Sequence, residues 1–354
     1  MFQKSDSIPS EEREISSADL QASIRRIVQR RILSRGEVDF PCVPALLDEY
    51  VADLIAMWGA IGKAFSDNER AQLRDAVALA LKTGFEATPY ARMVVSFEAQ
   101  PPPHGVRYAI RLKENTIDLH YEHWLSDRKG PLFGALPDAK VLELAERIGP
   151  PEKAPVLDIG AGTGRNAIAL ARVGHPTHAL ELVSALTVEM KKVQEDERLP
   201  LEVIEADVLS PVFVPRRDHY KLVILSEVTP HFRDVEELRA AMTKVADSLV
   251  SGGFVVMNAF LARGGYEPDA LAHQVSEVSW SRIFTRADLS FITGELPFEE
   301  ISDESVHDHE KAKRTAAEWP PTTWFVDWSR GRNVFDLPLG RAPVELRWIV
   351  YRKK

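Results

Sequence analysis

Val156-Leu-Asp-Ile-Gly-Ala-Gly-Thr-Gly-Arg-Asn166 is an apolar run that leads into a loop in which alternate residues are glycine. Pro155 precedes the run, and residues 167–173 after the loop are apolar and rich in alanine. This order predicts a strand, a glycine turn and a helix, which together open a nucleotide-binding βαβ unit. Glycine at positions 160, 162 and 164 permits dihedral angles that other residues avoid and lets a ligand approach bare backbone.

The spacing of these glycines differs from the dinucleotide fingerprint, which is Gly-x-Gly-x-x-Gly. Here the third glycine comes one residue earlier, and an acid precedes the loop. The stretch from Leu157 to Asn166 resembles motif I of class I S-adenosylmethionine-dependent methyltransferases, and its Gly-Arg-Asn ending resembles tellurite-resistance-type and related small-molecule enzymes. A structural turn and a nicotinamide site are the alternatives. The resemblance implies S-adenosylmethionine as cofactor, bound by Asp158, Gly160, Ala161, Gly162, Thr163, Gly164 and Asn166.

Downstream residues predict the rest of that family's core, a Rossmann-like α/β fold with seven strands. The resemblance extends over residues 136–354. In this region Ser251-Gly-Gly253 is expected to end the helix at 235–249, before the fifth strand of the sheet at 254–260. Apolar runs predict the strands after the glycine loop at 177–180, 201–206, 221–225, 254–260, 298–301 and 344–351, with the helix at 235–249 between the third and fourth of these.

Two strand ends carry acids that the resemblance assigns to the cofactor, because open α/β sheets bind ligands beyond the carboxyl ends of their strands. Glu181, followed by Leu182, is placed to accept the ribose hydroxyls. Asp207 and the backbone of Val208 are placed beside the adenine. The alternatives are a solvated helix-cap acid for Glu181 and an ordinary turn residue for Asp207.

The segment Ser226-Glu-Val-Thr-Pro-His231 follows the fourth predicted strand. Ser226 is expected at the cofactor. Glu227 and His231 are the candidate catalytic residues, to deprotonate the acceptor or to stabilise charge on it. The alternative for Glu227 is that it only orients the cofactor.

Residues 1–17 are charged and lack an apolar segment, so they are expected to be disordered. Residues 18–115 predict a mainly helical lobe, either a substrate lid or a dimerisation arm. Residues 116–135 resemble a segment that folds over the methionine end of the cofactor, with Tyr121 near the sulfonium and Arg128 at the carboxylate. The lobe's expected elements are helices at 19–33, 44–65 and 66–83, the last opened by a capping box, and a strand pair at 93–97 and 106–112.

Three tryptophans, Trp319, Trp324 and Trp328, lie within ten residues. They are candidates for a substrate pocket that takes an apolar or cationic acceptor, with core packing as the alternative. His307 and His309 have acids nearby, but no second cluster completes a coordination shell, so no metal is expected and a surface loop is the preferred interpretation.

Composition fits a cytoplasmic enzyme. The chain has 354 residues, 45% of them hydrophobic, and a single cysteine, Cys42, which excludes an intramolecular disulfide. The formal charge of −9 argues against a nucleic-acid partner, and no apolar run reaches membrane-spanning length. The five arginines at 25, 26, 30, 31 and 35 are interpreted as a solvated face.

Taken together, these patterns predict transfer of a methyl group from S-adenosylmethionine to a small-molecule acceptor, and a homodimer is possible. One alternative is an isoprenoid-type C-methyltransferase with Glu227 as the base. Another is a non-catalytic cofactor-binding module, against which the intact loop glycines and acids argue. An RNA or protein methyltransferase is disfavoured by the acidic charge and because Ser226-Glu-Val-Thr stands where an Asn-Pro-Pro-Tyr-type tetrad would be.

Overall fold

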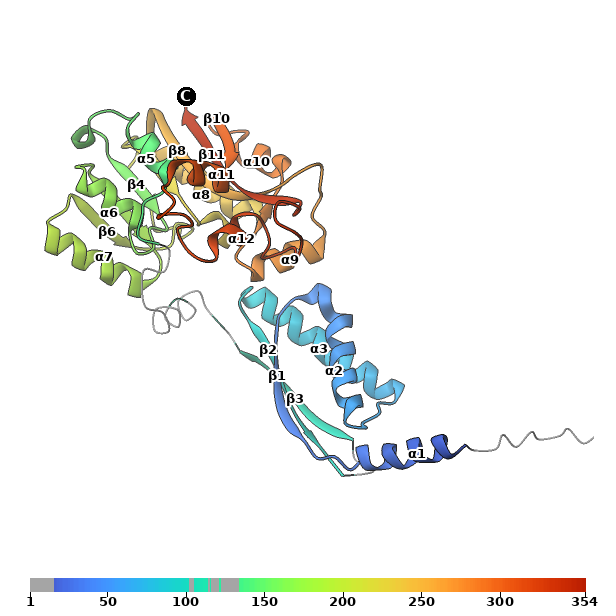
Figure 1. Cartoon of the computed structure of the whole chain (residues 1–354). Helices are drawn as coiled ribbons and strands as arrows, with labels where there is room; N and C mark the ends of the chain where they lie inside the picture. Colours follow the sequence, from blue (N-terminus) through green and yellow to red (C-terminus); the bar gives the residue numbers. More distant parts are fainter. Residues whose placement is uncertain (1–15, 102–104, 114, 116–120, 122–133) are drawn as a thin grey trace, which may run out of the picture. The chain divides into compact units, whose positions relative to one another are not determined.

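The computed structural model describes residues 16–101, 105–113, 115, 121 and 134–354. The chain divides into two compact units, Met1–Glu86 with Arg92–Lys113, and Ala87–Ala91 with Glu114–Lys354 (Figure 1). The second unit is therefore discontinuous in sequence. The lobe expected over 18–115 accordingly gives seven of its residues to the other unit, Ala87–Ala91 and positions 114 and 115.

The first unit combines helices with a three-stranded antiparallel sheet in the order β1-β2-β3. Trp58 is fully buried at its centre and stacks on Phe65 and Tyr108, with ring centroids 5.3 and 5.4 Å away. Serine hydroxyls cap α1 and α3, and the predicted capping box of Ser66 and Glu69 is present. The elements are α1 (Ser17–Gln29), β1 (Arg35–Pro41), η1 (Pro44–Leu46), α2 (Leu47–Ala60), α3 (Asp67–Ala87), β2 (Arg92–Ala99) and β3 (Val106–Lys113).

The strand β1 is absent from the sequence-based expectation of a strand pair. Its residues, Arg-Gly-Glu-Val-Asp-Phe-Pro, are half charged, so they lack an apolar run. The strand forms because it pairs along its whole length with β2, and Glu37 accepts a 2.9 Å ion pair from Arg111. The Glu37–Arg111 pair joins β1 to β3 across β2, and because both side chains are about half exposed, backbone pairing with β2 is the main reason that the strand forms.

The second unit is built on the order β10-β11-β8-β7-β4-β5-β6, with β9 paired to β8 outside this path. Strands β4 to β8 pair in parallel, and β11 is antiparallel to both of its neighbours. The strands are β4 (Val156–Ile159), β5 (Thr177–Glu181), β6 (Leu201–Glu205), β7 (Tyr220–Leu225), β8 (Leu249–Ala262), β9 (Ile283–Phe284), β10 (Phe298–Ser305) and β11 (Val344–Lys353).

Helices cover both faces of this sheet (Figure 1). One face packs on α8 and α10, and the other on α5, α6, α11 and α12. The helical elements are α5 (Ala139–Ala145), η2 (Pro151–Lys153), α6 (Arg165–Arg172), α7 (Ser184–Glu197), η3 (Thr229–His231), α8 (Val235–Ser248), α9 (Ala270–Val278), α10 (Arg286–Thr293), α11 (Val306–Lys313) and α12 (Phe325–Ser329). The mainly parallel α/β fold is thus confirmed, and the short strand β9 adds an eighth strand to the seven that were expected.

The start of β8 differs from expectation. The helix before it ends at Ser248, and the strand begins at once with Leu249, so Ser251-Gly-Gly253 lies inside the strand. The pairing with β7 shifts register over this stretch, because Tyr220 pairs with Leu249 and Leu222 pairs with Phe254. Gly252 has φ +80°, which accommodates the irregularity. Among the described residues, no helix is both long and apolar enough to cross a membrane.

Candidate functional site

A cavity of about 540 Å³ lies in the second unit, at the carboxyl ends of β4, β5 and β7. Its volume is in the range of small-molecule sites. Of the residues predicted for the site, its wall includes Tyr121, Asp158, Gly160, Ala161, Gly162, Thr163, Asn166, Glu181, Leu182, Asp207, Val208, Ser226, Glu227 and His231.

Two loop glycines are required by close packing. A Cβ on Gly160, whose φ is +66°, would lie 2.4 Å from Cγ2 of Val228. A Cβ on Gly164, with φ +84°, would lie 2.8 Å from Cδ1 of Ile168. Gly164 thus allows α6 to begin directly beneath the loop, and it is not among the residues of the cavity wall. Its role is packing of the helix, whereas Gly160 keeps the loop close to the segment after β7.

The acid at the end of β5 is held by backbone amides. Glu181 accepts hydrogen bonds from the N–H of Gly162 at 2.7 Å and from that of Val183 at 2.9 Å. It is 6% exposed and lines the cavity. These two hydrogen bonds fix how the carboxylate is oriented at the cavity wall. Asp207 accepts the N–H of Leu209 at 2.8 Å, which is a local turn contact and fits its alternative reading as a turn residue.

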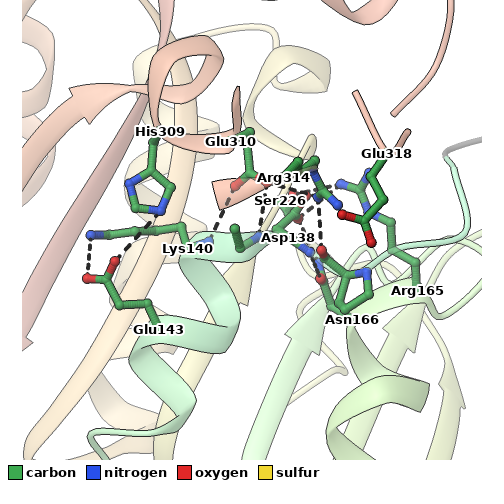
Figure 2. Close-up of polar contacts among 12 residues, drawn as sticks. Asp138, Lys140, Glu143, Arg165, Asn166, Ser226, His309, Glu310, Arg314 and Glu318 are labelled. Atoms are coloured by element: carbon green, nitrogen blue, oxygen red, sulfur yellow. Dashed lines mark hydrogen bonds and ion pairs between the residues drawn. The ribbon is translucent and has the colours of Figure 1, made fainter. Parts of the chain in front are cut away.

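A buried polar cluster around Asp138 forms the floor beneath the loop (Figure 2). One oxygen of Asp138 accepts from Ser226 Oγ at 2.7 Å, Asn166 Nδ2 at 2.9 Å and Arg165 Nη2 at 3.0 Å. The same Arg165 nitrogen lies 2.7 Å from Glu227 Oε1. This cluster connects the start of α6 to the residues that follow β7.

Burial by itself would lower the pKa of the Arg165 guanidinium, but the carboxylates of Asp138 and Glu227 reverse that effect and raise it. Arg165 is therefore a permanent cation. Burial raises the pKa of Glu227, against the influence of Arg165. Burial also raises the pKa of Asp158 to about 8, and the Asp138 carboxylate contributes.

Asp138 precedes α5 as its N-cap residue, yet its side chain makes no capping hydrogen bond. Glu310 of α11 does this instead, because its oxygens accept the N–H groups of Ala139 at 3.0 Å and Lys140 at 3.3 Å (Figure 2). Arg314 pairs with Glu310 at 2.9 Å. The insertion between β10 and β11 thus satisfies the helix end and leaves Asp138 to the cavity floor.

Glu227 occupies a left-handed backbone conformation, with φ +61°. For a residue with a side chain this costs on the order of 1 kcal/mol or more. Asn258 of β8 holds it in place, since its Oδ1 accepts the Glu227 N–H at 2.7 Å and its backbone oxygen accepts Thr229 Oγ1 at 2.5 Å. The turn directs the carboxylate back to Arg165.

The opposite wall of the cavity is aromatic and comes partly from the segment Ala87–Ala91. Tyr90 stacks on Trp280 with ring centroids 4.6 Å apart, and its hydroxyl lies 3.1 Å from Nδ1 of His231. His231 and Tyr121 also meet Trp280 edge-on, at 5.0 and 5.6 Å. Burial raises the pKa of Tyr90, so its hydroxyl stays protonated.

Several residues of this site were missed by the sequence analysis. Arg165 is part of the quoted loop but had no role assigned to it. Asp138 follows a proline and precedes an apolar helix, a capping pattern that could have drawn notice. Tyr90 and Trp280 have no local signal, because only the tertiary fold brings them to His231.

Other predicted residues lie elsewhere. Arg128 falls outside the described residues, as do positions 1–15 of the tail. The three tryptophans are not among the residues of the cavity wall. Trp328 is 6% exposed, packs on Phe260 at 5.2 Å and donates through Nε1 to the backbone oxygen of Trp280 at 3.1 Å. Trp319 and Trp324 pack against the same core, which favours the core-packing alternative.

His307 and His309 belong to α11 rather than to a surface loop, and His307 is buried. Nδ1 of His309 lies 2.8 Å from Glu304 Oε2, and Nδ1 of His307 lies 2.9 Å from Asp308 Oδ1. Within the described part of the chain, no three His, Cys, Asp or Glu side chains are grouped so that they could hold a metal.

Comparison with known proteins gives one family match. Residues 127–295 match the model of a methyltransferase domain. This span includes the glycine loop, Glu181, Asp207 and the segment after β7. No curated protein matches the chain.

Solved structures with a similar fold include a protein from Galdieria sulphuraria assigned as a sarcosine dimethylglycine methyltransferase. It is 15% identical, with a TM-score of 0.49, over 67% of this chain and 98% of the other. A geranyl diphosphate C-methyltransferase from Streptomyces coelicolor A3(2) is 11% identical, with a TM-score of 0.46, over 64% of this chain and 90% of the other. The [4+2]-cyclase SpnF is 13% identical, with a TM-score of 0.43, over 65% and 90%. Similarities this low carry no inference about the reaction or the substrate.

Proposed function

We propose that this chain, which carries a class I S-adenosylmethionine-dependent methyltransferase domain, transfers a methyl group from that cofactor to a small-molecule acceptor. The observation that carries the proposal is the cavity itself, where the glycine loop, Glu181, Asp207 and Glu227 meet at the carboxyl ends of parallel strands. Those strand ends are where α/β sheets of this type bind ligands.

The residues present fit the cofactor. Gly160 lines the cavity, and Val228 fills the space that its Cβ would take, so the glycine keeps the loop close to the segment after β7. Glu181, fixed by two amide hydrogen bonds, is suited to ribose hydroxyls. Asp207 and Val208 are proposed for the adenine, and Tyr121 for the sulfonium end. When bound, the cofactor supplies an electrophilic methyl group on sulfur.

The protein's own part is alignment and proton handling. We assign the proton of the acceptor to His231, because the Tyr90 hydroxyl orients its imidazole at Nδ1 and the ring lines the cavity. Glu227 is bound to Arg165, so its first role is to fix the floor of the site. Its raised pKa also suits a carboxylate that accepts a proton, which keeps the C-methyltransferase alternative in view.

Two further assignments accompany this function. The first unit is proposed as a substrate lid, with a dimerisation arm as the alternative. The mass of the protein in solution tests the alternative, because it distinguishes a homodimer from a monomer. A cytoplasmic location is proposed because the one cysteine, Cys42, is a buried free thiol whose pKa is raised by burial to about 11.

The test is calorimetric titration with S-adenosylmethionine and S-adenosylhomocysteine of the wild type, Gly162→Arg and Gly264→Arg. Gly162 has φ +57° in the cavity wall, whereas Gly264 has φ +60° with open space around it, so the second variant controls for backbone strain. We expect binding to be lost only in Gly162→Arg. If neither ligand binds to the wild type, the proposal is refuted.

The second stage is a screen of small acceptors with a labelled methyl donor. Transfer to one of them supports an enzyme. Tight cofactor binding with no transfer to any acceptor class would favour a non-catalytic cofactor-binding module.

A further inference from the structure

Two buried acids lie close together at the start of α5 and have separate partners. Asp138 is 3% exposed and Glu310 is 1% exposed. Asp138 pairs with Arg165 at 3.0 Å, and Glu310 pairs with Arg314 at 2.9 Å. Burial, with the Asp138 carboxylate as a second cause, raises the pKa of Glu310, as expected for two acids near one another in a dry site. Each acid thus has a cation of its own.

Asp138 has the backbone of a helix cap. It is extended, with φ −66° and ψ 130°, and its carbonyl oxygen accepts the N–H of Leu142 at 3.1 Å. Aspartate is among the residues preferred at this position, where the carboxylate usually accepts an N–H of the first turn. Here Glu310 accepts the N–H groups of Ala139 and Lys140 instead. The Asp138 carboxylate is therefore left for other partners.

Those partners belong to the cavity. Figure 2 shows Glu310 reaching the start of α5 while Asp138 turns to the floor. One oxygen of Asp138 accepts hydrogen bonds from Arg165, Asn166 and Ser226, and all three of these residues line the cavity. The N–H of Asp138 also donates to Oδ1 of Asn166 at 2.9 Å. A single residue thus fixes three side chains of the wall.

Two forces would draw Asp138 to the helix in the absence of Glu310. The first is the need of the amide groups at the start of α5 for an acceptor, since an unsatisfied N–H away from water is costly. The second is the charge of Arg314, which is 6% exposed and donates to the backbone oxygen of Pro137 at 2.9 Å. Without Glu310 this guanidinium would attract the carboxylate of the next residue, Asp138.

The floor can release Asp138 because its cation has a second acid. Nη2 of Arg165 also lies 2.7 Å from Oε1 of Glu227, so the guanidinium remains paired. Asn166 and Ser226 would lose the oxygen that fixes their side chains at the cavity. The exchange would thus loosen the wall and keep the charge of Arg165 paired.

We propose that Glu310 is a positioning residue for the cavity floor, because it caps α5 in place of Asp138 and so keeps the Asp138 carboxylate on the floor. When Glu310 is removed, Asp138 returns to the helix and releases Arg165, Asn166 and Ser226. The exchange of partners follows from the geometry alone, whereas its effect on the methyl donor rests on the proposed function.

The first measurement is a crystal structure of Glu310→Ala. We expect a carboxylate oxygen of Asp138 at about 3 Å from a backbone nitrogen of the first turn of α5, and no longer on Ser226. An Asp138 carboxylate that stays on Asn166 and Ser226 would overturn the proposal. This result does not depend on any ligand.

The second measurement is calorimetric titration with S-adenosylmethionine of the wild type, Glu310→Ala, Asp138→Ala and the double variant. We expect each single variant to bind about tenfold more weakly. The double variant should bind as Glu310→Ala does, because the floor lacks Asp138 in both. If Glu310 only stabilised α5, its loss would leave binding unchanged or would add to the effect of Asp138→Ala, and either result would contradict a positioning role.

Glu310→Gln keeps one side-chain oxygen for an amide of α5, so it should weaken binding less than Glu310→Ala. If Glu310→Ala does not fold, Glu310→Gln and its double variant with Asp138→Ala carry the same comparison. Thermal unfolding of every variant checks that it is folded.

Thr285→Ala is the control for loss of a helix cap. The Thr285 hydroxyl accepts the N–H of Asp288 at 3.1 Å, and no described residue of α10 lines the cavity. This variant should leave the affinity unchanged. If the wild type does not bind the donor, the proposed function fails, and the crystal structure of Glu310→Ala still decides whether Asp138 exchanges its partners.

Discussion

The hydroxyl oxygen of Tyr90 lies 3.1 Å from Nδ1 of His231, although 141 positions separate the two residues. The second unit takes the segment Ala87–Ala91 from within the sequence of the first unit, and Ala87 to Tyr90 of this segment line the cavity. Since Trp280 stacks on Tyr90 and meets His231 edge-on, the imidazole is held from two directions.

Tyr90→Phe should therefore reduce kcat about ten- to a hundredfold and leave the affinity for the cofactor unchanged, because the ring remains but Nδ1 of His231 loses its partner. The measurement is steady-state kinetics with the acceptor found by the labelled-methyl screen, including the pH–rate profile. The matched control is Tyr266→Phe, a tyrosine that packs on Phe335 outside the cavity wall. An unaltered kcat and pH profile would contradict a positioning role for Tyr90.

Asp138→Ala should destabilise the second unit by about 3–5 kcal/mol, because Arg165, Asn166 and Ser226 all lose the oxygen that accepts from them. Asp138→Asn keeps one oxygen in that position and should cost less. Denaturant unfolding measures both, and calorimetry should show weaker cofactor binding in the alanine variant. Equal stability of the two variants would mean that the three hydrogen bonds contribute nothing.

Asp158→Asn should stabilise the protein, and the gain should grow with pH. In the unfolded chain this carboxyl has a pKa of about 3.9, whereas in the folded protein burial raises it to about 8. Between these values the unfolded chain releases the proton while the folded chain retains it. The wild type therefore loses stability as pH rises through this window.

At pH 4, close to the pKa of the unfolded chain, we expect wild type and Asp158→Asn to melt at similar temperatures. At pH 8 the variant should be more stable by about 1–3 kcal/mol, read as a rise of several degrees in Tm. A gain that is constant with pH would show that Asp158 does not carry this proton.

Gly160→Ala should abolish cofactor binding and lower stability by more than about 2 kcal/mol, since the new Cβ meets Val228 at 2.4 Å. Gly264→Ala is the matched control, because its φ is +60° against +66° for Gly160 but nothing lies within 4 Å of the new Cβ. Gly264→Ala should lower the free energy of unfolding by about 1 kcal/mol, which is the effect of the unfavourable backbone angle alone. Thermal unfolding and calorimetry together separate the two effects, and equal losses in the two variants would argue against crowding at Val228.

The parallel core could be predicted because its strands are nearly continuous apolar runs that end in polar residues. In Tyr220–Leu225 the run Leu222-Val-Ile-Leu225 is wholly apolar and buried, so its sequence indicates its environment directly, whereas Thr177–Glu181 is equally buried with only two apolar residues. The glycine loop was equally clear, because its backbone angles exclude other residues. The edge strand β1 was not, since it is half charged and its stability comes from a partner more than 50 positions away.

The cavity floor was beyond local reasoning for a different reason. Asp138 and Arg165 each have an ordinary local interpretation, a helix cap and the first residue of a helix. Their actual pairing depends on Glu310, which takes over the capping of α5 from a separate helix. Local sequence patterns predict hydrogen bonds between residues that are close in the chain. They do not predict that Glu310, from a distant helix, caps α5 in place of Asp138.

Because the second unit is discontinuous in sequence, it cannot be expressed whole as a fragment that begins after the first unit. A fragment that begins at residue 114 would contain the family-matched region and every strand of the large sheet, and by alignment it would look complete. It would nevertheless lack Tyr90, expose one face of Trp280 and leave Nδ1 of His231 without its hydroxyl. We expect such a fragment to lose activity, because the imidazole of His231 would no longer be positioned by Tyr90. Four residues that precede position 114 in the chain, Ala87 to Tyr90, are therefore part of the cavity wall, and any cut between 91 and 114 removes them.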